Sequence, residues 1–488
     1  MNIGRIKTYV LIALIISSIF LSAYLWGDES LLPGGTTLFA GIKQNPVVKM
    51  LFGIEEEYSI PKENLSKPEK AVVTNGTNRY VFYNTDDNFD RIFSDAKGFL
   101  ADFFSEKSMV LKSETVESSE WYSVLRNDEL LDSRTVYIDY SLEYSSSLFA
   151  QVIGAKNTWL DRSLTVREFI IAPLDEGGTN LIFYMRDSRS GAVHKYFVKY
   201  DKLDIYGNIL KAQSEDASGY LFAFELNLDK SEDDAGVGTG VTQKVFFDPL
   251  VLISPYPQEN AVIKSINPLD ETDGYDKIVQ EFGYKPASLK WHVDSQRTRH
   301  YVDNYSTFKI YPGGFLEYTS LDGEHGIRVA GAGASVYEQL NSAIEFAEGV
   351  WGKILPGKKL DVLVTSNLLT PSDDGLLFTL DYYFEGTPVS VNTQLPFEMK
   401  RAIEIKMKDG VITGYRHILR RFEKSGENVS FTSPVEVLDG IYSMFKDGEE
   451  VSITDLYATY KEDGVSDVIS PMWCVKLSNR ENPIFYTP

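Results

Sequence analysis

The stretch Thr8–Trp26, TYVLIALIISSIFLSAYLW, contains nineteen consecutive uncharged residues, most of them apolar or aromatic. A helix needs about 20 such residues to cross the hydrocarbon core of a bilayer, and inside lipid each backbone polar group must find its partner within the segment. We therefore expect a transmembrane helix here. Arg5 and Lys7 precede it, whereas Asp28 and Glu29 follow it. The positive-inside rule then places the short N-terminus in the cytoplasm and the rest of the chain outside.

Small residues lie together on one side of this predicted helix. Ser18 and Ser22 are four residues apart and share a helix face, with Ala23 beside them. Small side chains let transmembrane helices approach closely, and serine can donate hydrogen bonds between helices. We predict that this face packs against a transmembrane helix of a partner. The alternative, that the serines are only tolerated in a single anchor, stays open.

A cleaved signal peptide is the competing interpretation of the same stretch, because a short basic segment precedes an apolar core. However, the apolar run exceeds the roughly 7 to 15 residues of a signal-peptide core, and no cleavage site of the A-x-A type follows it. Tyr24, Leu25 and Trp26 are residues typical of a membrane interface. The pattern therefore favours an anchor that is retained.

Composition restricts the possible functions. The chain carries 48 Lys and Arg residues against 70 Asp and Glu residues, so its formal net charge is −22. A protein this acidic does not wrap nucleic acid. The single cysteine, Cys474, excludes an internal disulfide and a Cys-rich metal site. The histidines lack metal-site spacing, and the sequence contains no Walker A, G-x-S-x-G or H-E-x-x-H motif. We therefore predict no catalytic residue, no metal and no cofactor.

Hydrophobic periodicity predicts an α+β protein with a multidomain body of antiparallel sheets and packed helices. Helices are predicted from a stripe of apolar residues between Phe89 and Phe104 and from another over Ser335–Val350. Most other periodic segments alternate, as strands do. The predicted parts are a cytoplasmic N-terminus (1–7), a transmembrane helix (8–26), a stalk (27–67), an N-terminal α/β domain (68–162), a central β-rich domain (163–285) and a C-terminal α+β domain (286–488).

Two motifs invite a chemical interpretation. Gly331–Ser335, GAGAS, lacks the third glycine of the dinucleotide-binding fingerprint, so we predict a loop in which Ser335 caps a helix and forms a capping box with Glu338. The segment Asp294–His300, DSQRTRH, combines an acid, two arginines and a histidine. On an alternating strand this combination predicts a solvated strand or an ion pair rather than an acid–base site.

Three further predictions depend on strand alternation. The segment Tyr220–Leu228 alternates and is predicted to form a strand, and Val411–Phe422 is predicted to form another. His194 and His417 lie alone among strand residues. We expect both histidines to be half-buried side chains without a chemical role.

The sequence resembles the YycH family, and its C-terminal third also resembles the partner family YycI. At the N-terminus the resemblance rests on Arg5–Thr8, RIKT, followed at once by an anchor that ends in Leu25 and Trp26. The order and length of the later sections also agree. The C-terminal segments that carry the resemblance are Leu380–Val389 (LDYYFEGTPV), Ile403–Ile412 (IEIKMKDGVI), Ser452–Tyr460 (SITDLYATY) and Pro471–Val475 (PMWCV).

This resemblance implies an uncleaved N-terminal helix, an extracytoplasmic α+β body and no enzymatic activity. It also implies a complex with the WalK-like sensor histidine kinase of the WalK/WalR (YycG/YycF) cell-wall two-component system of Gram-positive bacteria, beside a YycI-like protein. The hypothesis is thus a single-pass regulator in the cell membrane. The alternatives are an anchored cell-wall-modifying enzyme and an extracytoplasmic protein-binding or inhibitor module that uses exposed sheet edges.

Overall fold

The computed structural model describes residues 67–486 apart from internal segments. The segments left out are 77, 85–87, 127–133, 156–157, 176–177, 206, 208–210, 213–219, 227, 229–244, 254–258, 272–274, 286–289, 324, 366–374, 394–395, 431–436, 438–439, 441–450 and 479–482. The predicted transmembrane helix 8–26, with Ser18, Ser22 and Ala23, therefore lies outside the described residues. None of the helices in the described part combines the length and the apolar character that a membrane span requires.

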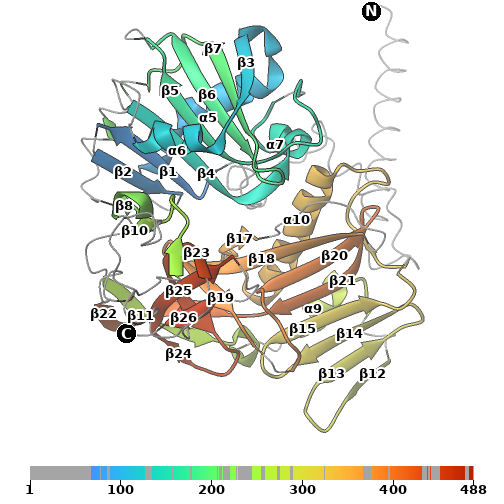
Figure 1. The fold of residues 1–488 in the computed structure, drawn as a ribbon. Helices are drawn as coiled ribbons and strands as arrows, with labels where there is room; N and C mark the ends of the chain where they lie inside the picture. The colour runs from blue at the N-terminus through green and yellow to red at the C-terminus, as the bar shows by residue number, and fades with distance from the viewer. Residues whose placement is uncertain are drawn as a thin grey trace, which may run out of the picture.

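The first sheet has seven strands, all antiparallel, in the order β2-β1-β4-β5-β6-β7-β3 (Figure 1). These strands are β1 (Lys70–Asn75), β2 (Asn78–Tyr83), β3 (Val110–Val116), β4 (Arg134–Ser145), β5 (Thr165–Pro173), β6 (Asn180–Asp187) and β7 (Val193–Lys199). One face packs against α5 (Phe89–Ser105) and α7 (Ser146–Val152), and the other against α6 (Ser118–Arg126). We call this sheet with its three helices the first lobe.

The apolar stripe predicted between Phe89 and Phe104 is confirmed as the buried side of α5. Its phenylalanines meet rings from the sheet, and the Phe103 and Phe183 ring centroids are 4.5 Å apart. Burying each aromatic side chain contributes roughly 1.5–3 kcal/mol to folding. Aromatic contacts therefore supply much of the packing between this helix and the first sheet.

The second sheet has fourteen strands and is mostly antiparallel. Its main path runs β12-β13-β14-β15-β21-β20-β18-β19-β23-β25-β26, while β16 pairs with β21, β17 with β18 and β9 with β23. The strands are β9 (Val245–Phe247), β12 (Lys290–Val293), β13 (Arg299–Val302), β14 (Ser306–Tyr311), β15 (Phe315–Ser320), β16 (Ile327–Arg328), β17 (Val362–Val364), β18 (Leu376–Phe384), β19 (Thr387–Val391), β20 (Ile403–Lys408), β21 (Val411–Ile418), β23 (Val451–Glu462), β25 (Pro471–Leu477) and β26 (Ile484–Tyr486).

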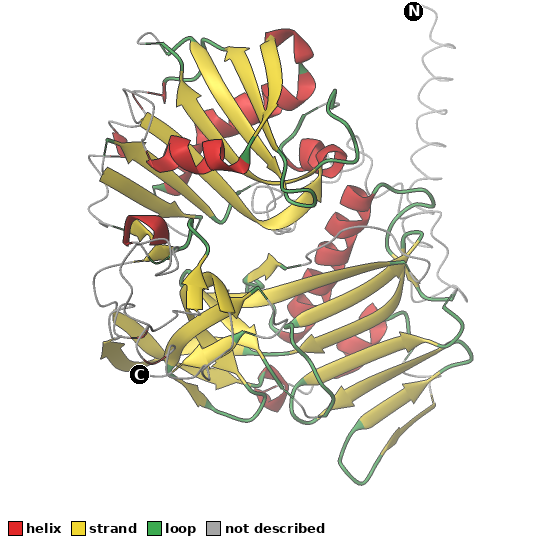
Figure 2. Cartoon of the chain, viewed as in Figure 1, coloured by secondary structure: helices red, strands yellow, loops and turns green. Residues whose placement is uncertain are grey.

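Two helices pack on one face of this sheet, α9 (Tyr275–Glu281) and α10 (Val336–Ile354) (Figure 2). The capping box predicted at the start of the second helix is confirmed: Ser335 Oγ accepts a hydrogen bond from the Glu338 backbone, and the Glu338 carboxylate accepts one from the Ser335 backbone. We call the fourteen-stranded sheet with its two helices the second lobe. Helix α10 also contacts α7, so one apolar core continues between the lobes.

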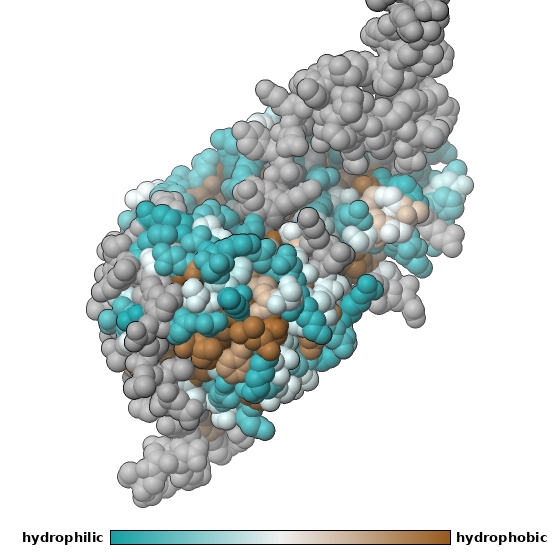
Figure 3. Space-filling model, turned by 90° about the horizontal axis from the view of Figure 1, so that it is seen from above, coloured by the Kyte–Doolittle hydropathy of each residue, from teal (hydrophilic) through white to brown (hydrophobic). Residues whose placement is uncertain are grey.

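Two small sheets complete the described chain. One pairs β8 (Leu221–Phe222) with β10 (Leu252–Ile253), and the other has the order β22-β11-β24. The strands of the latter are β11 (Glu259–Ile266), β22 (Arg421–Ser430) and β24 (Val468–Ile469). The described part is thus α+β with mostly antiparallel sheets and few helices, as the sequence predicted. On the face seen in Figure 3 hydrophilic side chains predominate, and hydrophobic ones gather in a limited area.

Two predicted strands are wrong. Most of Tyr220–Leu228 is not extended, because β8 ends at Phe222 and a 3-10 helix, Ala223–Leu226, follows. The Glu225 carboxylate closes this turn by accepting a hydrogen bond from the Phe222 backbone at 2.9 Å. The predicted strand Val411–Phe422 is divided into β21 and β22, which belong to different sheets. The chain changes sheets at Leu419 and Arg420, where the arginine side chain is buried.

The first sheet runs across residue 162, at which the sequence predicts a domain boundary. Strands β4 and β5 lie on either side of that residue and pair with each other. The segments predicted as the N-terminal and central domains therefore contribute to one sheet. How the chain divides into independently folding domains stays a prediction.

Candidate functional site

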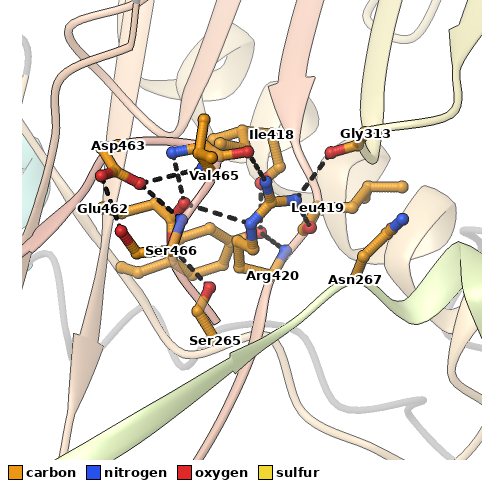
Figure 4. Close-up of polar contacts among 12 residues, drawn as sticks. Ser265, Asn267, Gly313, Ile418, Leu419, Arg420, Glu462, Asp463, Val465 and Ser466 are labelled. Atoms are coloured by element: carbon orange, nitrogen blue, oxygen red, sulfur yellow. Dashed lines mark hydrogen bonds and ion pairs between the residues drawn. The ribbon is translucent and has the colours of Figure 1, made fainter. Parts of the chain in front are cut away.

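Two groups of charged side chains stand out among the described residues, and the first lies where the second lobe meets the small sheet that contains β11. Arg420 and Glu462 are 5% and 0% exposed, and Arg420 Nε lies 3.2 Å from Glu462 Oε1 (Figure 4). Ser265 Oγ donates to the other carboxylate oxygen, and the Gly464 backbone donates to Oε1 at 2.7 Å. The guanidinium also donates to the carbonyl oxygens of Gly313 and Gly464. We call these five residues the Arg420 cluster.

The Arg420 cluster joins segments that are far apart in the sequence. Ser265 belongs to β11, Glu462 ends β23, and Gly313 lies in the turn between β14 and β15. The next residue, Gly314, has φ 81°, and a Cβ there would lie 2.7 Å from Arg420 Nη1. A glycine is therefore required at this turn. Because protein groups surround both charges, the cluster belongs to the folded interior and is no candidate for a ligand site.

A buried histidine lies close to the Arg420 cluster. His417 is fully buried, with Nε2 2.8 Å from the Tyr382 hydroxyl and Nδ1 2.8 Å from the Tyr415 hydroxyl. Tyr382 donates to the Ile418 carbonyl at 2.9 Å, so its oxygen accepts from Nε2–H and Tyr415 donates to Nδ1. Burial lowers the pKa of His417 to about 3. The prediction that His417 is half-buried is wrong, because both ring nitrogens find partners in the core; His194 is half-buried as predicted.

The second group of charges lies beside a cleft of about 910 Å³ between the two lobes, and Glu69, Arg167, Asp455 and Lys476 line this cleft. The first lobe contributes residues of β2, β4 and β5, and the second contributes residues of β17, β18, β19, β23 and β25. The charged side chains that line the cleft are Lys67, Glu69, Arg167, Asp381, Glu385, Lys400, Arg401, Asp455 and Lys476.

Asp139 is the centre of the charges on the first-lobe side. Its carboxylate accepts from Arg167 Nε at 2.8 Å and Arg167 Nη2 at 3.2 Å, and Lys70 Nζ lies 3.3 Å from Oδ2. Burial works to raise the pKa of Asp139, but the positive charges of Arg167 and Lys70 outweigh it and hold the pKa below its ordinary value. At neutral pH the Asp139 carboxylate is therefore ionised, and both of its oxygens contact Arg167 or Lys70.

The second lobe contributes Asp455 and Lys476, whose Oδ2 and Nζ are 3.2 Å apart. Burial works to raise the pKa of Asp455, but Lys476 and Lys70 lower it below its ordinary value. Glu69, on the chain that enters β1, behaves differently. Its burial and the negative charges of Asp455 and Asp139 raise its pKa, although Lys70 opposes them. Charges on one lobe thus shift the pKa values of groups on the other lobe. We call the following six residues the Asp139 cluster: Glu69, Lys70, Asp139, Arg167, Asp455 and Lys476.

The residues that the sequence predicted as a partner-binding site, Ser18, Ser22 and Ala23, lie outside the described residues. Of the segment Asp294–His300, residues 294–298 form the turn between β12 and β13, and Arg299 and His300 begin β13. Asp294 Oδ2 lies 2.9 Å from His300 Nε2. The predicted alternation fails at Arg297, which has φ 65° in that turn. Sequence reasoning missed the cleft, because Asp139 and Asp455 are more than 300 residues apart in the chain.

Comparison with known proteins gives one informative result. No family model and no curated protein matches the sequence. Among solved structures, the fold is similar to the crystal structure of YycH from Bacillus subtilis, with a TM-score of 0.54 over 86% of this chain and 96% of that chain. The chain has the fold of YycH. Sequence identity to YycH is 12%, so the likeness concerns the fold alone.

Proposed function

We propose that this chain is a non-enzymatic, membrane-anchored regulator that modulates a WalK-like sensor histidine kinase from outside the cell, beside a YycI-like protein. The observation that carries this proposal is the likeness to YycH, which covers 96% of the YycH chain and both lobes of this one. The apolar stretch Thr8–Trp26 supports it independently, because a span of that length suits an anchor in the cell membrane.

The proposed mechanism couples the two lobes to the membrane helix. A regulator shifts a kinase equilibrium only if it contacts the two kinase states with different free energies. A helix face that carries Ser18, Ser22 and Ala23 offers such a contact within the membrane. A change in the orientation of the extracytoplasmic body would then alter how this face packs against the kinase helix.

The test exchanges the anchor in the full chain for an unrelated transmembrane helix of equal length. We expect regulation, measured as phosphorylation of the response regulator in cells, to be lost while the chain stays in the membrane. Ser18→Leu and Ser22→Leu are the finer variants, with Ser17→Leu as the matched control on a neighbouring face. Crosslinking in membranes should recover the kinase with the natural anchor. Equal regulation by a soluble fragment that starts at Thr37 would exclude the helix contact.

One observation favours a cell-wall-modifying enzyme as the second candidate. Glu69 has a raised pKa and lines the same cleft as Asp455, whose pKa is lowered, and such pairs can divide acid and base roles. However, Asp455 is already paired with Lys476, whose Nζ lies 3.2 Å from its Oδ2. Incubation of the full chain and of Glu69→Gln with peptidoglycan decides the matter: release of fragments by the natural chain alone would establish the enzyme.

A further inference from the structure

Strand β12 lies at one end of the second sheet, where its outer edge is open (Figure 1). It pairs with β13 only, and within the described part of the chain no strand pairs with its opposite edge. All four residues of β12 are exposed. Trp291 and Val293 are 54% and 48% exposed, so two large apolar side chains lie beside the open edge. An exposed apolar strand edge is a template for pairing with another chain.

One hydrogen bond shows which backbone groups of β12 point outward. Asp294 N donates to Thr298 O at 3.1 Å in the turn between β12 and β13. Along an antiparallel strand, residues that bond to the neighbouring strand alternate with residues whose N–H and C=O groups point away. The even-numbered residues of β12 therefore bond to β13, and the N–H and C=O groups of Trp291 and Val293 point outward. Among the described residues, these outward groups have no hydrogen-bond partner.

We propose that β12 pairs with β12 of a second copy of this chain, antiparallel and with the two His292 residues facing each other on the two-fold axis. Trp291 then lies opposite Val293 of the second copy, and each of these two symmetric pairs exchanges two backbone hydrogen bonds. A shift of the register by two residues in either direction leaves one outward-pointing residue opposite a residue outside the strand. A surface that complements itself in this way forms the isologous contact of a two-fold dimer. This contact is separate from the membrane-helix contact proposed above.

The side chains are also complementary in this register. On one face of the strand, Trp291 meets Val293 of the second copy, and apolar cross-strand pairs of this kind are stabilising. On the other face, Lys290 lies opposite Asp294 of the second copy. Lys290 is exposed and makes no ion pair among the described residues. The Asp294 side chain contacts His300 Nε2 at 2.9 Å but remains 33% exposed, and because a carboxylate oxygen accepts more than one hydrogen bond, it can also accept from Lys290.

A cysteine on the two-fold axis tests the register. Non-hydrogen-bonded pairs place their Cα atoms about 4.5 Å apart, a distance that a disulfide spans, so His292→Cys should link two copies. The full chain is oxidised mildly in membranes and separated on a non-reducing gel. Val302→Cys is the matched control, because Val302 is 41% exposed and lies on the same face, one strand further from the axis. The natural Cys474 is buried and should not crosslink.

We expect a covalent dimer with His292→Cys, and only monomer with Val302→Cys and with the natural chain. A His292→Cys chain that stays monomeric would overturn the proposal. Equal crosslinking of the two variants would overturn the register, because the proposed pairing keeps the two copies of Val302 apart.

A second measurement follows the dimer without a crosslink. Both copies carry a net charge of −22 and the shared edge is four residues long, so the dimer is weak. Sedimentation equilibrium of the full chain in detergent therefore extends to about 0.5 mM protein. Val293→Lys places a charge opposite Trp291 in both symmetric pairs and should weaken the dimer at least about tenfold.

Val293→Thr is the control for that variant. It keeps the β-branched shape and should dimerise within about threefold of the natural chain. Because Val293 is exposed, both variants should have the melting temperature of the natural chain. Equal dimerisation of Val293→Lys and the natural chain, or a natural chain that is monomeric over the whole concentration range, would overturn pairing through β12.

Discussion

The Arg420 cluster and the Asp139 cluster contain the same kinds of groups in different surroundings. In the first, the ion pair of Arg420 and Glu462 lies within one lobe and protein groups complete its hydrogen bonds. In the second, the charges come from both lobes, and Glu69, Arg167, Asp455 and Lys476 line a cleft. The Lys476 side chain is 49% exposed. The difference is one of enclosure: the first cluster is closed off within the protein, whereas the second is partly open to solvent at the cleft.

The largest expected effect is in the Arg420 cluster. Glu462→Ala leaves the buried guanidinium of Arg420 without its counter-charge, and breaking a buried pair in this way costs about 3–5 kcal/mol. Urea unfolding followed by circular dichroism measures the loss. Glu462→Gln is the control, because it keeps an acceptor for Arg420 and should cost less. Equal stability of the natural chain and Glu462→Ala would show that the cluster does not fix the fold.

Asp139→Asn should have the next largest effect. It removes the charge that faces Arg167 and Lys70, and since Arg167 is partly exposed we expect a loss of about 2 kcal/mol in the free energy of unfolding. Glu114→Gln, at a partly exposed carboxylate that faces Lys112 and Lys195, is the control and should change the transition much less. A loss as large as that of Glu462→Ala would remove the contrast between the two clusters.

The third prediction concerns pH. The pKa of His417 is lowered to about 3 in the folded chain, whereas the unfolded value is about 6.5. Below about pH 6.5, His417 therefore binds a proton in the unfolded chain but not in the folded chain. The contribution of His417 to the free energy of unfolding is fully present above that pH and is lost as pH falls toward 3. The loss is about 1.4 kcal/mol per pH unit, or about 2 kcal/mol at pH 5.

Urea unfolding between pH 7 and pH 4.5 checks this prediction. The natural chain should lose stability more steeply than His417→Gln, which carries no titrating group at this position. His325→Gln, at an exposed histidine, should keep the slope of the natural chain. Parallel pH profiles for the natural chain and His417→Gln would contradict the lowered pKa.

The smallest expected effect is a gain. The pKa of Glu69 is raised in the folded chain, chiefly by burial, so the folded state favours the protonated carboxyl and loses stability as pH rises through that pKa. Glu69→Gln removes the penalty and should stabilise the chain at pH 7 by less than about 1 kcal/mol. A rise in melting temperature at pH 7 that disappears at pH 4 is the expected result. A loss of stability at pH 7 would mean that the ionised carboxylate is needed at this position.

The sequence predicted those helices and strands whose own residues show a clear hydrophobic periodicity. The apolar stripes predicted between Phe89 and Phe104 and over Ser335–Val350 lie in α5 and α10, because their apolar side chains recur at helical spacing. Strand β3, Val110–Val116, was missed. It lies at a sheet edge, and its side chains are exposed or half-buried, so its sequence shows no clear alternation of apolar residues. The cleft was missed because it depends on residues that only tertiary structure brings together.

Strand β23 receives partners from both ends of the second lobe's sequence. It pairs in parallel with β9, Val245–Phe247, and antiparallel with β25, which in turn holds β26, Ile484–Tyr486. Contacts so distant in sequence form slowly, and the open strand edges that wait for them are prone to aggregation. During synthesis, β9 therefore cannot pair until β23, Val451–Glu462, has been made. Until then its edge is a place where the growing chain can pair wrongly.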